Sequence, residues 1–182
     1  MEHETRSLRD GRSVLIRDGQ VGDGALFHDY LAELGASTEY MLTHPGDMAM
    51  ARVYEKSLEK IEAGGFYALN AFDIESGAMV GNAALYFGER VKLSHVAGLA
   101  MGVLPEWQGN GLGMWMLDRA VQDIKRQPKI QRLQLVVMEG NDHAKAMYER
   151  AGFVHEGRKV KAVRQPDGSY RDEFLMGMWV GD

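Results

Sequence analysis

The sequence predicts a single α/β domain, in which helices cover both faces of a mixed sheet of about seven strands. The chain has 182 residues, 45% hydrophobic and 26% charged, which suits one globular domain with a sizeable core. The predicted strands and helices follow one another in the order β, α, α, β, β, β, α, β, α, β, β. Hairpins near both ends exclude a purely parallel sheet, and the central β-α-β unit requires one parallel pair.

The sequence before the break "THPGD" predicts one strand and one helix. We expect residues 1–12 to form a flexible N-terminus because they are polar, so the domain occupies residues 13–182. The β-branched run Ser13–Arg17 predicts the first strand. Four apolar residues then recur at helical spacing: Phe27, Tyr30, Leu31 and Leu34.

A second helix is predicted after the break "THPGD", with Asp47 as its candidate N-cap. Its apolar stripe consists of Met50, Tyr54, Leu58 and Ile61. The run Ala63–Gly65 ends this helix. The segments "FYALNAF" and "AMVGNAALYF" flank "DIESG" and predict a β-hairpin.

The second half of the chain begins with a long predicted strand, Ser94–Val103, which leads through a glycine-rich turn into a helix. One face of that helix carries Leu117, Ala120, Val121 and Ile124. "QRLQLVVM" alternates as a strand does. "NDHAKAMYERAG" predicts a short helix with Asn141 or Asp142 as N-cap and Gly152 at its end. Two last strands flank the turn "QPDGS".

The composition excludes several classes of function. The net charge of −5 argues against nucleic acid as a main partner, because phosphate binding needs a basic face. The chain has no cysteine and therefore no disulfide, no thiolate metal ligand and no cysteine nucleophile. The polar start resembles no signal peptide, and no apolar run reaches membrane-spanning length. We therefore expect a cytoplasmic protein with no membrane partner.

The stretch "QGNGLG" places Gly109, Gly111 and Gly113 between a predicted strand and a predicted helix. Free backbone N–H groups and the helix dipole make such a turn an anion site, for which phosphate is the natural guest. The stretch lacks the Lys-Ser/Thr ending of a P-loop, and Met114 stands where the dinucleotide fingerprint needs glycine. A phosphate loop and a plain glycine turn both remain open on this pattern.

Two motifs in the correct order resemble the GNAT superfamily of acyl-CoA-dependent N-acyltransferases. The first is Q/R-x-x-G-x-G/A, matched by Gln108, Gly111 and Gly113 after Val103-Leu104-Pro105. The second is N-x-x-A-x-x-x-Y-x-x-x-G-F, matched by Asn141, Ala144, Tyr148, Gly152 and Phe153. The resemblance covers most of residues 79–180, and the N-terminal third matches only in element order. It points to a bacterial small-molecule, amino-acid or ribosomal-protein branch.

The resemblance implies acetyl-CoA as co-substrate and no metal. Six residues are expected to hold its pyrophosphate through their amides: Gln108, Gly109, Asn110, Gly111, Leu112 and Gly113. The main chain of Met101, Gly102 and Val103 is expected to pair with the pantetheine arm where the sheet splays apart. Asn141 and Ala144 are expected to contact coenzyme A, and Asn141 is also expected as a helix N-cap.

The resemblance also implies catalytic roles. Tyr148 is expected to protonate the leaving thiolate, although its spacing equally suits a core aromatic. Many relatives place Glu or His on the strand before the loop, where this chain has Ala97. His95, on the same strand face, is the candidate general base, with packing or substrate binding as the alternative. His155 and Glu156 are further candidates. A water-relayed base or an amine that arrives neutral would also suffice.

The expected mechanism is direct attack of an amine on the thioester, with a backbone amide near Met101 stabilising the oxyanion. The expected acceptor is a small amine or amino acid, bound by the first two helices and the last hairpin. Four acidic residues are candidate cation partners, or simply a solvated face: Glu33, Glu39, Asp47 and Glu55. Alternatives are a protein N-terminus as acceptor, a non-catalytic acyl-CoA sensor and an ATP-binding enzyme. A homodimer is a further expectation.

Overall fold

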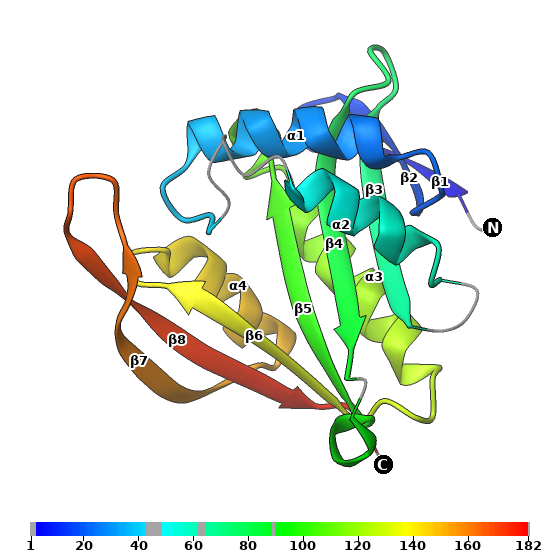
Figure 1. The fold of residues 1–182 in the computed structure, drawn as a ribbon. Coiled ribbons are helices and arrows are strands. Elements are labelled where there is room, and N and C mark those ends of the chain that lie inside the picture. The colour runs from blue at the N-terminus through cyan, green and yellow to red at the C-terminus, as the bar shows by residue number, and fades with distance from the viewer. Residues whose placement is uncertain (1–2, 43–48, 62–64, 89, 182) are drawn as a thin grey trace.

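The computed structural model describes residues 3–42, 49–61, 65–88 and 90–181, which form one eight-stranded mixed sheet in the order β1-β2-β3-β4-β5-β6-β8-β7 (Figure 1). The strands are β1 (His3–Ser7), β2 (Ser13–Asp18), β3 (Phe66–Asp73), β4 (Met79–Phe87), β5 (Val96–Val103), β6 (Arg132–Met138), β7 (Val154–Arg164) and β8 (Tyr170–Trp179). The helices are α1 (Gly24–Ser37), α2 (Ala49–Leu58), α3 (Leu112–Lys125) and α4 (Asp142–Ala151), with short 3₁₀ turns η1 (Val91–Leu93) and η2 (Pro105–Trp107). Within the described ranges, no helix is long and apolar enough to cross a bilayer.

The predicted fold class is confirmed, but the sheet has one strand more than expected. The added strand is β1, which pairs antiparallel with β2 from His3 opposite Arg17 to Ser7 opposite Ser13. The prediction of a flexible segment over residues 1–12 is therefore wrong for residues 3–7. All five side chains of β1 are exposed, so backbone pairing is the main interaction that forms this edge strand, and Arg6 adds a contact with the Trp115 ring at 5.3 Å. The sequence of β1 has no alternation of apolar and polar residues from which a strand could be predicted.

Helices cover both faces of the sheet, as predicted. In Figure 1, α1 and α2 lie in front of the strands, and α3 and α4 lie behind them. Adjacent residues of β4 point to opposite layers: the Asn82 amide donates to the Tyr54 hydroxyl of α2 at 3.2 Å, whereas a Cβ on Gly81 would meet Met116 of α3. The predicted parallel pair is β5 with β6, joined through α3.

The predicted apolar faces are largely buried. All four predicted residues of α1 and all four of α3 lie in the core. In α2, Tyr54 and Leu58 are buried, but the helix ends at Leu58, so Ile61 follows it instead of extending its stripe. Asp47 and the side chain of Met50 lie outside the described residues.

The sheet splays between β5 and β6. These strands pair at only three positions: Val96 with Arg132, Ala97 with Leu133, and Gly98 with Gln134. On its other edge, β5 pairs with β4 from Ala97 to Val103. Figure 1 shows β5 and β6 diverging towards their carboxyl ends. The second half of β5 therefore has one edge without a strand partner, as the GNAT resemblance implied.

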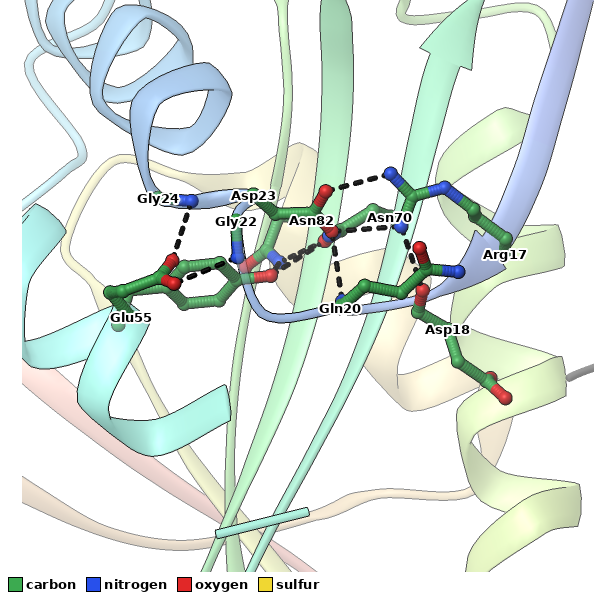
Figure 2. Close-up of polar contacts among 10 residues, drawn as sticks. Arg17, Asp18, Gln20, Gly22, Asp23, Gly24, Glu55, Asn70 and Asn82 are labelled. Carbon is green, nitrogen blue, oxygen red and sulfur yellow. Dashed lines mark hydrogen bonds and ion pairs between the residues drawn. The ribbon is translucent and has the colours of Figure 1, made fainter. Parts of the chain in front are cut away.

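A buried polar network fixes α1 and α2 to the sheet (Figure 2). Arg17 donates to both carboxylate oxygens of Asp23, at 2.8 and 2.7 Å. Asp23 also accepts from the Asn70 amide at 3.0 Å. The Asn70 carbonyl oxygen in turn accepts from the Tyr54 hydroxyl at 2.9 Å and from the Asn82 amide at 2.7 Å. Because each buried polar atom has a partner, the network joins β2, β3, β4 and the two helices at little desolvation cost.

The start of α1 is capped from the neighbouring helix. The Glu55 carboxylate on α2 accepts hydrogen bonds from the backbone N–H groups of Gly22 and Gly24, at 2.7 and 2.8 Å (Figure 2). A Cβ on Gly24 would lie 2.6 Å from Glu55 Oε2, so a side chain there would displace this cap. The sequence suggested Glu55 as a candidate cation partner. In the structure its carboxylate instead accepts hydrogen bonds from free backbone N–H groups at the start of α1.

Burial alone raises the pKa of Asp23, but hydrogen bonds from Arg17, the Gln20 N–H and Asn70 outweigh it and hold the pKa below its usual value. A carboxyl whose folded pKa is depressed contributes stability above its unfolded pKa of about 3.9. That contribution is lost as the pH falls through the folded pKa. Asp23 thus makes the fold sensitive to acid.

We predict that Asp23→Asn lowers the free energy of unfolding by about 2–4 kcal/mol at pH 7, because Arg17 loses its counterion inside the fold. Urea denaturation at pH 7 and pH 3 measures it. The difference in the free energy of unfolding between wild type and variant should become smaller at the lower pH, where Asp23 is increasingly protonated. Asp29→Asn on the exposed side of α1 is the control and should stay within about 0.5 kcal/mol. Equal destabilisation by both variants would contradict this role.

Candidate active site

The glycine loop forms a tight turn in front of α3. Gly109 and Gly111 have left-handed backbones, with φ of 75° and 91°. Gly111 is the N-cap of α3 and offers no side-chain cap. The N–H groups of Gly109, Asn110 and Gly111 have no hydrogen-bond acceptor within the described part of the chain. Several free donors therefore gather at the positive end of a 14-residue helix.

Side chains hold this loop in shape. The Gln108 side-chain amide donates to the Val103 carbonyl at 2.8 Å, which ties the loop to the end of β5. The Asn110 amide donates to the Gln108 carbonyl at 3.2 Å and to Asp10 Oδ2 at 2.8 Å. Gln108 and Asn110 thus use their side chains inside the protein. The Gln108 backbone N–H donates to the Pro105 carbonyl at 3.1 Å, so it is not free for a ligand, whereas the Asn110 N–H is. The contact of both residues with a pyrophosphate stays a prediction.

The free edge of β5 presents two of the three predicted backbone residues. The Leu104 N–H donates to the Val80 carbonyl at 2.9 Å, which fixes the alternation of backbone groups along β5. The N–H groups of Met101 and Val103 therefore face the side where β6 has diverged. Gly102 instead directs its backbone groups towards β4. An extended ligand along this edge meets Met101 and Val103 as an added strand would.

Helix α4 has the predicted start and end. Asn141 is its N-cap, and the Asn141 Oδ1 accepts from the Ala144 N–H at 3.2 Å. Gly152 ends the helix with a φ of 102°. The capping role of Asn141 is confirmed, and the contact of Asn141 and Ala144 with coenzyme A stays a prediction. Met147 of α4 approaches Gly113 of the loop, since a Cβ on Gly113 would lie 3.4 Å from its sulfur.

Tyr148 combines a packed ring with an accessible hydroxyl. Its ring meets Phe153 edge-on with centroids 5.7 Å apart, so the core interpretation is correct for the ring. Every buried side-chain nitrogen and oxygen of the described residues has a partner, and the Tyr148 hydroxyl makes no hydrogen bond among them. That hydroxyl is therefore reached by solvent. Burial of the side chain raises the pKa of Tyr148 and keeps the phenol protonated.

Tyr30 reaches the same region from α1. A Cβ on Gly102 would lie 2.7 Å from the Tyr30 hydroxyl oxygen, so only glycine leaves room for this tyrosine over β5. Burial first, and then the nearby Tyr54 and Tyr148, raise the pKa of Tyr30. Tyr30 and Tyr148 are thus close enough to interact electrostatically. Helical spacing placed Tyr30 in the core and gave no indication that its hydroxyl would lie beside the splay.

The structure separates His95 from the glycine loop. The expected strand Ser94–Val103 begins only at Val96, and His95 precedes it. The His95 carbonyl accepts from the N–H groups of Gln131 and Arg132, at 2.9 and 3.1 Å, where β5 and β6 start to pair. His95 lies eight residues before Val103, roughly 26 Å along a strand. Its catalytic role stays a prediction.

Glu156 and His155 have structural partners. Glu156 forms an ion pair with Arg132, whose hydrogen bond lowers the pKa of the Glu156 carboxyl. A carboxylate with a lowered pKa is a weak proton acceptor. His155 lies against the Phe174 ring, with centroids 5.5 Å apart. Across the described ranges, no group of three or more His, Asp or Glu side chains is placed to hold a metal ion.

A pocket of about 600 Å³ opens between the segment after α1 and the β7–β8 hairpin, the region expected to bind the acceptor. It is lined by Gly35, Thr38, Glu39, Met41, Leu42, Val163, Arg164, Gln165 and Pro166. The Gln165 amide contacts the Met138 sulfur at 3.5 Å, which places this wall at the diverging end of β6. Glu39 pairs with Arg171 at 2.6 Å. Arg164 makes no ion pair with any described residue.

An elongated ligand with a phosphate at the loop would extend along the unpaired edge of β5. This geometry suits a transferase for groups carried on coenzyme A. Residues 45–153 match the acetyltransferase (GNAT) family, and the chain belongs to that family. The predicted family, acetyltransferase class and acetyl-CoA co-substrate are thereby confirmed. The free N–H groups of the loop and the unpaired edge of β5 fit this donor.

Similar proteins support the same family. The chain is 26% identical over 100 residues to L-amino acid N-acetyltransferase AaaT of Escherichia coli (strain K12), covering 55% of this chain and 61% of that relative. A GNAT-family acetyltransferase from Streptococcus pneumoniae matches with a TM-score of 0.82 and 23% identity, over 91% of this chain and 99% of that one. A phosphinothricin acetyltransferase from Sinorhizobium meliloti, solved with acetyl-CoA, matches with a TM-score of 0.78 and 19% identity, over 92% of this chain and 89% of that one. At these identities the structural likeness shows the fold alone.

We predict that Gly111→Ala weakens acetyl-CoA binding by about tenfold, because a φ of 91° strains alanine and shifts the donors of the loop. Titration calorimetry measures the dissociation constant. Gly77→Ala in the β3–β4 turn is matched, since Gly77 has a φ of 73° and open space around its Cβ position. It should lose similar stability but retain wild-type affinity. A Gly111→Ala variant that binds as tightly as wild type would show that the loop does not hold the donor.

Proposed function

We propose that this chain transfers the acetyl group of acetyl-CoA to the primary amine of a small molecule or amino acid, by direct attack in a ternary complex. The observation that carries this proposal is the unpaired edge of β5, which follows from only three pairs between β5 and β6. The glycine loop lies at its end, and Tyr30 and Tyr148 lie beside it.

The backbone of this chain supplies most of the donor site. The N–H groups of Gly109, Asn110 and Gly111, with the first turn of α3, hold the pyrophosphate. The Met101 and Val103 backbone pairs with the amides of the pantetheine arm. A backbone N–H near Met101 stabilises negative charge on the carbonyl oxygen during attack. These donors are fixed before the ligand arrives, so little reorganisation opposes the reaction.

In the chemical step, the amine nitrogen forms a bond to the thioester carbon, the carbon–sulfur bond breaks, and the nitrogen loses a proton. Tyr148 gives its phenolic proton to the departing thiolate, and solvent restores that proton from the amine. Burial raises the pKa of Tyr148. The same surroundings disfavour a thiolate anion and so raise the pKa of the departing thiol as well. The thiolate therefore remains basic enough to take the proton from the phenol. No covalent enzyme intermediate is needed.

The pocket supports a small acceptor. A volume of about 600 Å³ suits a metabolite-sized ligand. Glu39 on its wall is neutralised by Arg171, whereas Arg164 brings a positive charge without an ion-pair partner among the described residues. That charge favours an acceptor with a carboxylate over a polyamine. The similarity to an L-amino acid N-acetyltransferase agrees with this choice.

Release of free thiol from acetyl-CoA tests the proposal, against a panel of amino acids, polyamines, aminoglycosides and short peptides. We expect turnover with amino acids or other small amines. Turnover with peptides alone would replace the proposed acceptor by a protein N-terminus. Binding of acetyl-CoA without turnover on any acceptor would favour a non-catalytic sensor. Absence of acetyl-CoA binding would overturn the proposed function.

We predict that Tyr148→Phe lowers kcat by about 10²-fold, the usual contribution of a general acid, while the affinity for acetyl-CoA changes by less than about threefold. Steady-state kinetics and calorimetry together measure this split. Tyr170→Phe, which removes a hydroxyl from an exposed tyrosine, is the control and should keep wild-type kcat. If the Tyr148→Phe variant keeps wild-type kcat, solvent rather than Tyr148 protonates the thiolate.

We also predict that His95→Gln leaves kcat/KM within about threefold of wild type, because the acceptor amine arrives neutral. Consequently kcat/KM should rise about tenfold per pH unit until the pH reaches the pKa of the amine. Because the pKa of Tyr148 is raised, ionisation of the phenol should cause no decline up to about pH 10. A pH–rate profile for both proteins measures this. Loss of a neutral-pH inflection in the variant would instead make His95 the base.

A further inference from the structure

The turn between β1 and β2 packs against the glycine loop. Asp10 Oδ2 accepts from the Asn110 side-chain amide at 2.8 Å. Arg12 donates to the Glu106 carbonyl, and its guanidinium stacks 3.9 Å from the centroid of the Trp107 ring. These contacts join a segment one hundred residues away in sequence to both η2 and the loop itself.

Two of the charged residues in this turn neutralise each other. Arg12 donates to Asp10 Oδ2 from Nε at 2.9 Å and from a terminal nitrogen at 2.6 Å. The hydrogen bond from the Arg12 side chain lowers the pKa of the Asp10 carboxyl, which therefore stays ionised at neutral pH. The pair serves to hold the turn on the loop and offers no net charge to a ligand.

Arg9 is the remaining charged residue of this turn, and it takes no part in the pair of Asp10 and Arg12. Its side chain is exposed, and its Nε lies 4.0 Å from the place where a Cβ on Gly111 would be. Arg9 makes no hydrogen bond or ion pair with any described residue. A positive charge beside the N-terminus of a helix is unfavourable, because the helix dipole is positive there too. An anion between Arg9 and the free N–H groups of the loop would reverse the sign of that interaction.

We propose that Arg9 binds a phosphate of the coenzyme A nucleotide, which makes the β1–β2 turn part of the donor site. The inference rests on the proposed function, since it takes acetyl-CoA as the ligand of the loop. Arginine suits this role because its planar donors match phosphate oxygens. The contact lies at the rim and is screened by solvent, so its contribution is moderate and falls as salt increases.

The test is the dissociation constant of acetyl-CoA by calorimetry, for wild type, Arg9→Gln and Arg126→Gln. Arg126 caps the opposite end of α3, so its replacement removes the same charge far from the loop. We expect Arg9→Gln to weaken binding by about 3- to 10-fold at low salt, with a smaller loss at high salt. Arg126→Gln should bind as wild type does.

Titration with 3′-dephospho-coenzyme A identifies which phosphate is bound. If the difference between wild type and Arg9→Gln disappears with this ligand, Arg9 contacts the 3′-phosphate. If the difference persists, Arg9 contacts the pyrophosphate. Wild-type affinity of Arg9→Gln for acetyl-CoA, or an equal loss in Arg126→Gln, would overturn the inference while the proposed function stands. Failure of the wild-type protein to bind acetyl-CoA would instead overturn the proposed function first.

Discussion

The donor site depends on one constraint: β5 and β6 exchange hydrogen bonds at only three residue pairs. Had the pairing continued to Val103, the N–H groups of Met101 and Val103 would be used inside the sheet. Because β6 turns away to pair with β8, those groups stay available within a folded core. The sheet leaves part of one internal edge unpaired, and in the proposed function the pantetheine arm completes it.

The sequence carried enough information for the elements and for the loop. Helical spacing identified the buried faces of α1 and α3, and the glycines before Leu112 identified a turn at the start of α3. These features are local, so a short window of sequence contains their physical cause. Asn141 and Gly152 likewise belong to local capping patterns, and both occupy the expected ends of α4.

Features that depend on long-range packing were not predictable in this way. β1 exists through backbone pairing with β2, and its five exposed residues carry no period. Arg9 reaches Gly111, and Tyr30 reaches Gly102, from distant segments, and no spacing in the sequence relates them to these positions. His95 shows the opposite error: period-two alternation placed it on the face of Ala97, but the strand begins one residue after it.

A donor site built from main-chain N–H groups has a consequence for how this protein can change. In the proposed donor site most side chains contribute no atom to the ligand, so many replacements at Met101 would leave the donors in place. The proposed acceptor pocket is different, because residues such as Arg164 line it. Under the proposed function, substitutions in the hairpin and in the segment after α1 would change the acceptor without altering the backbone groups that hold the acyl donor.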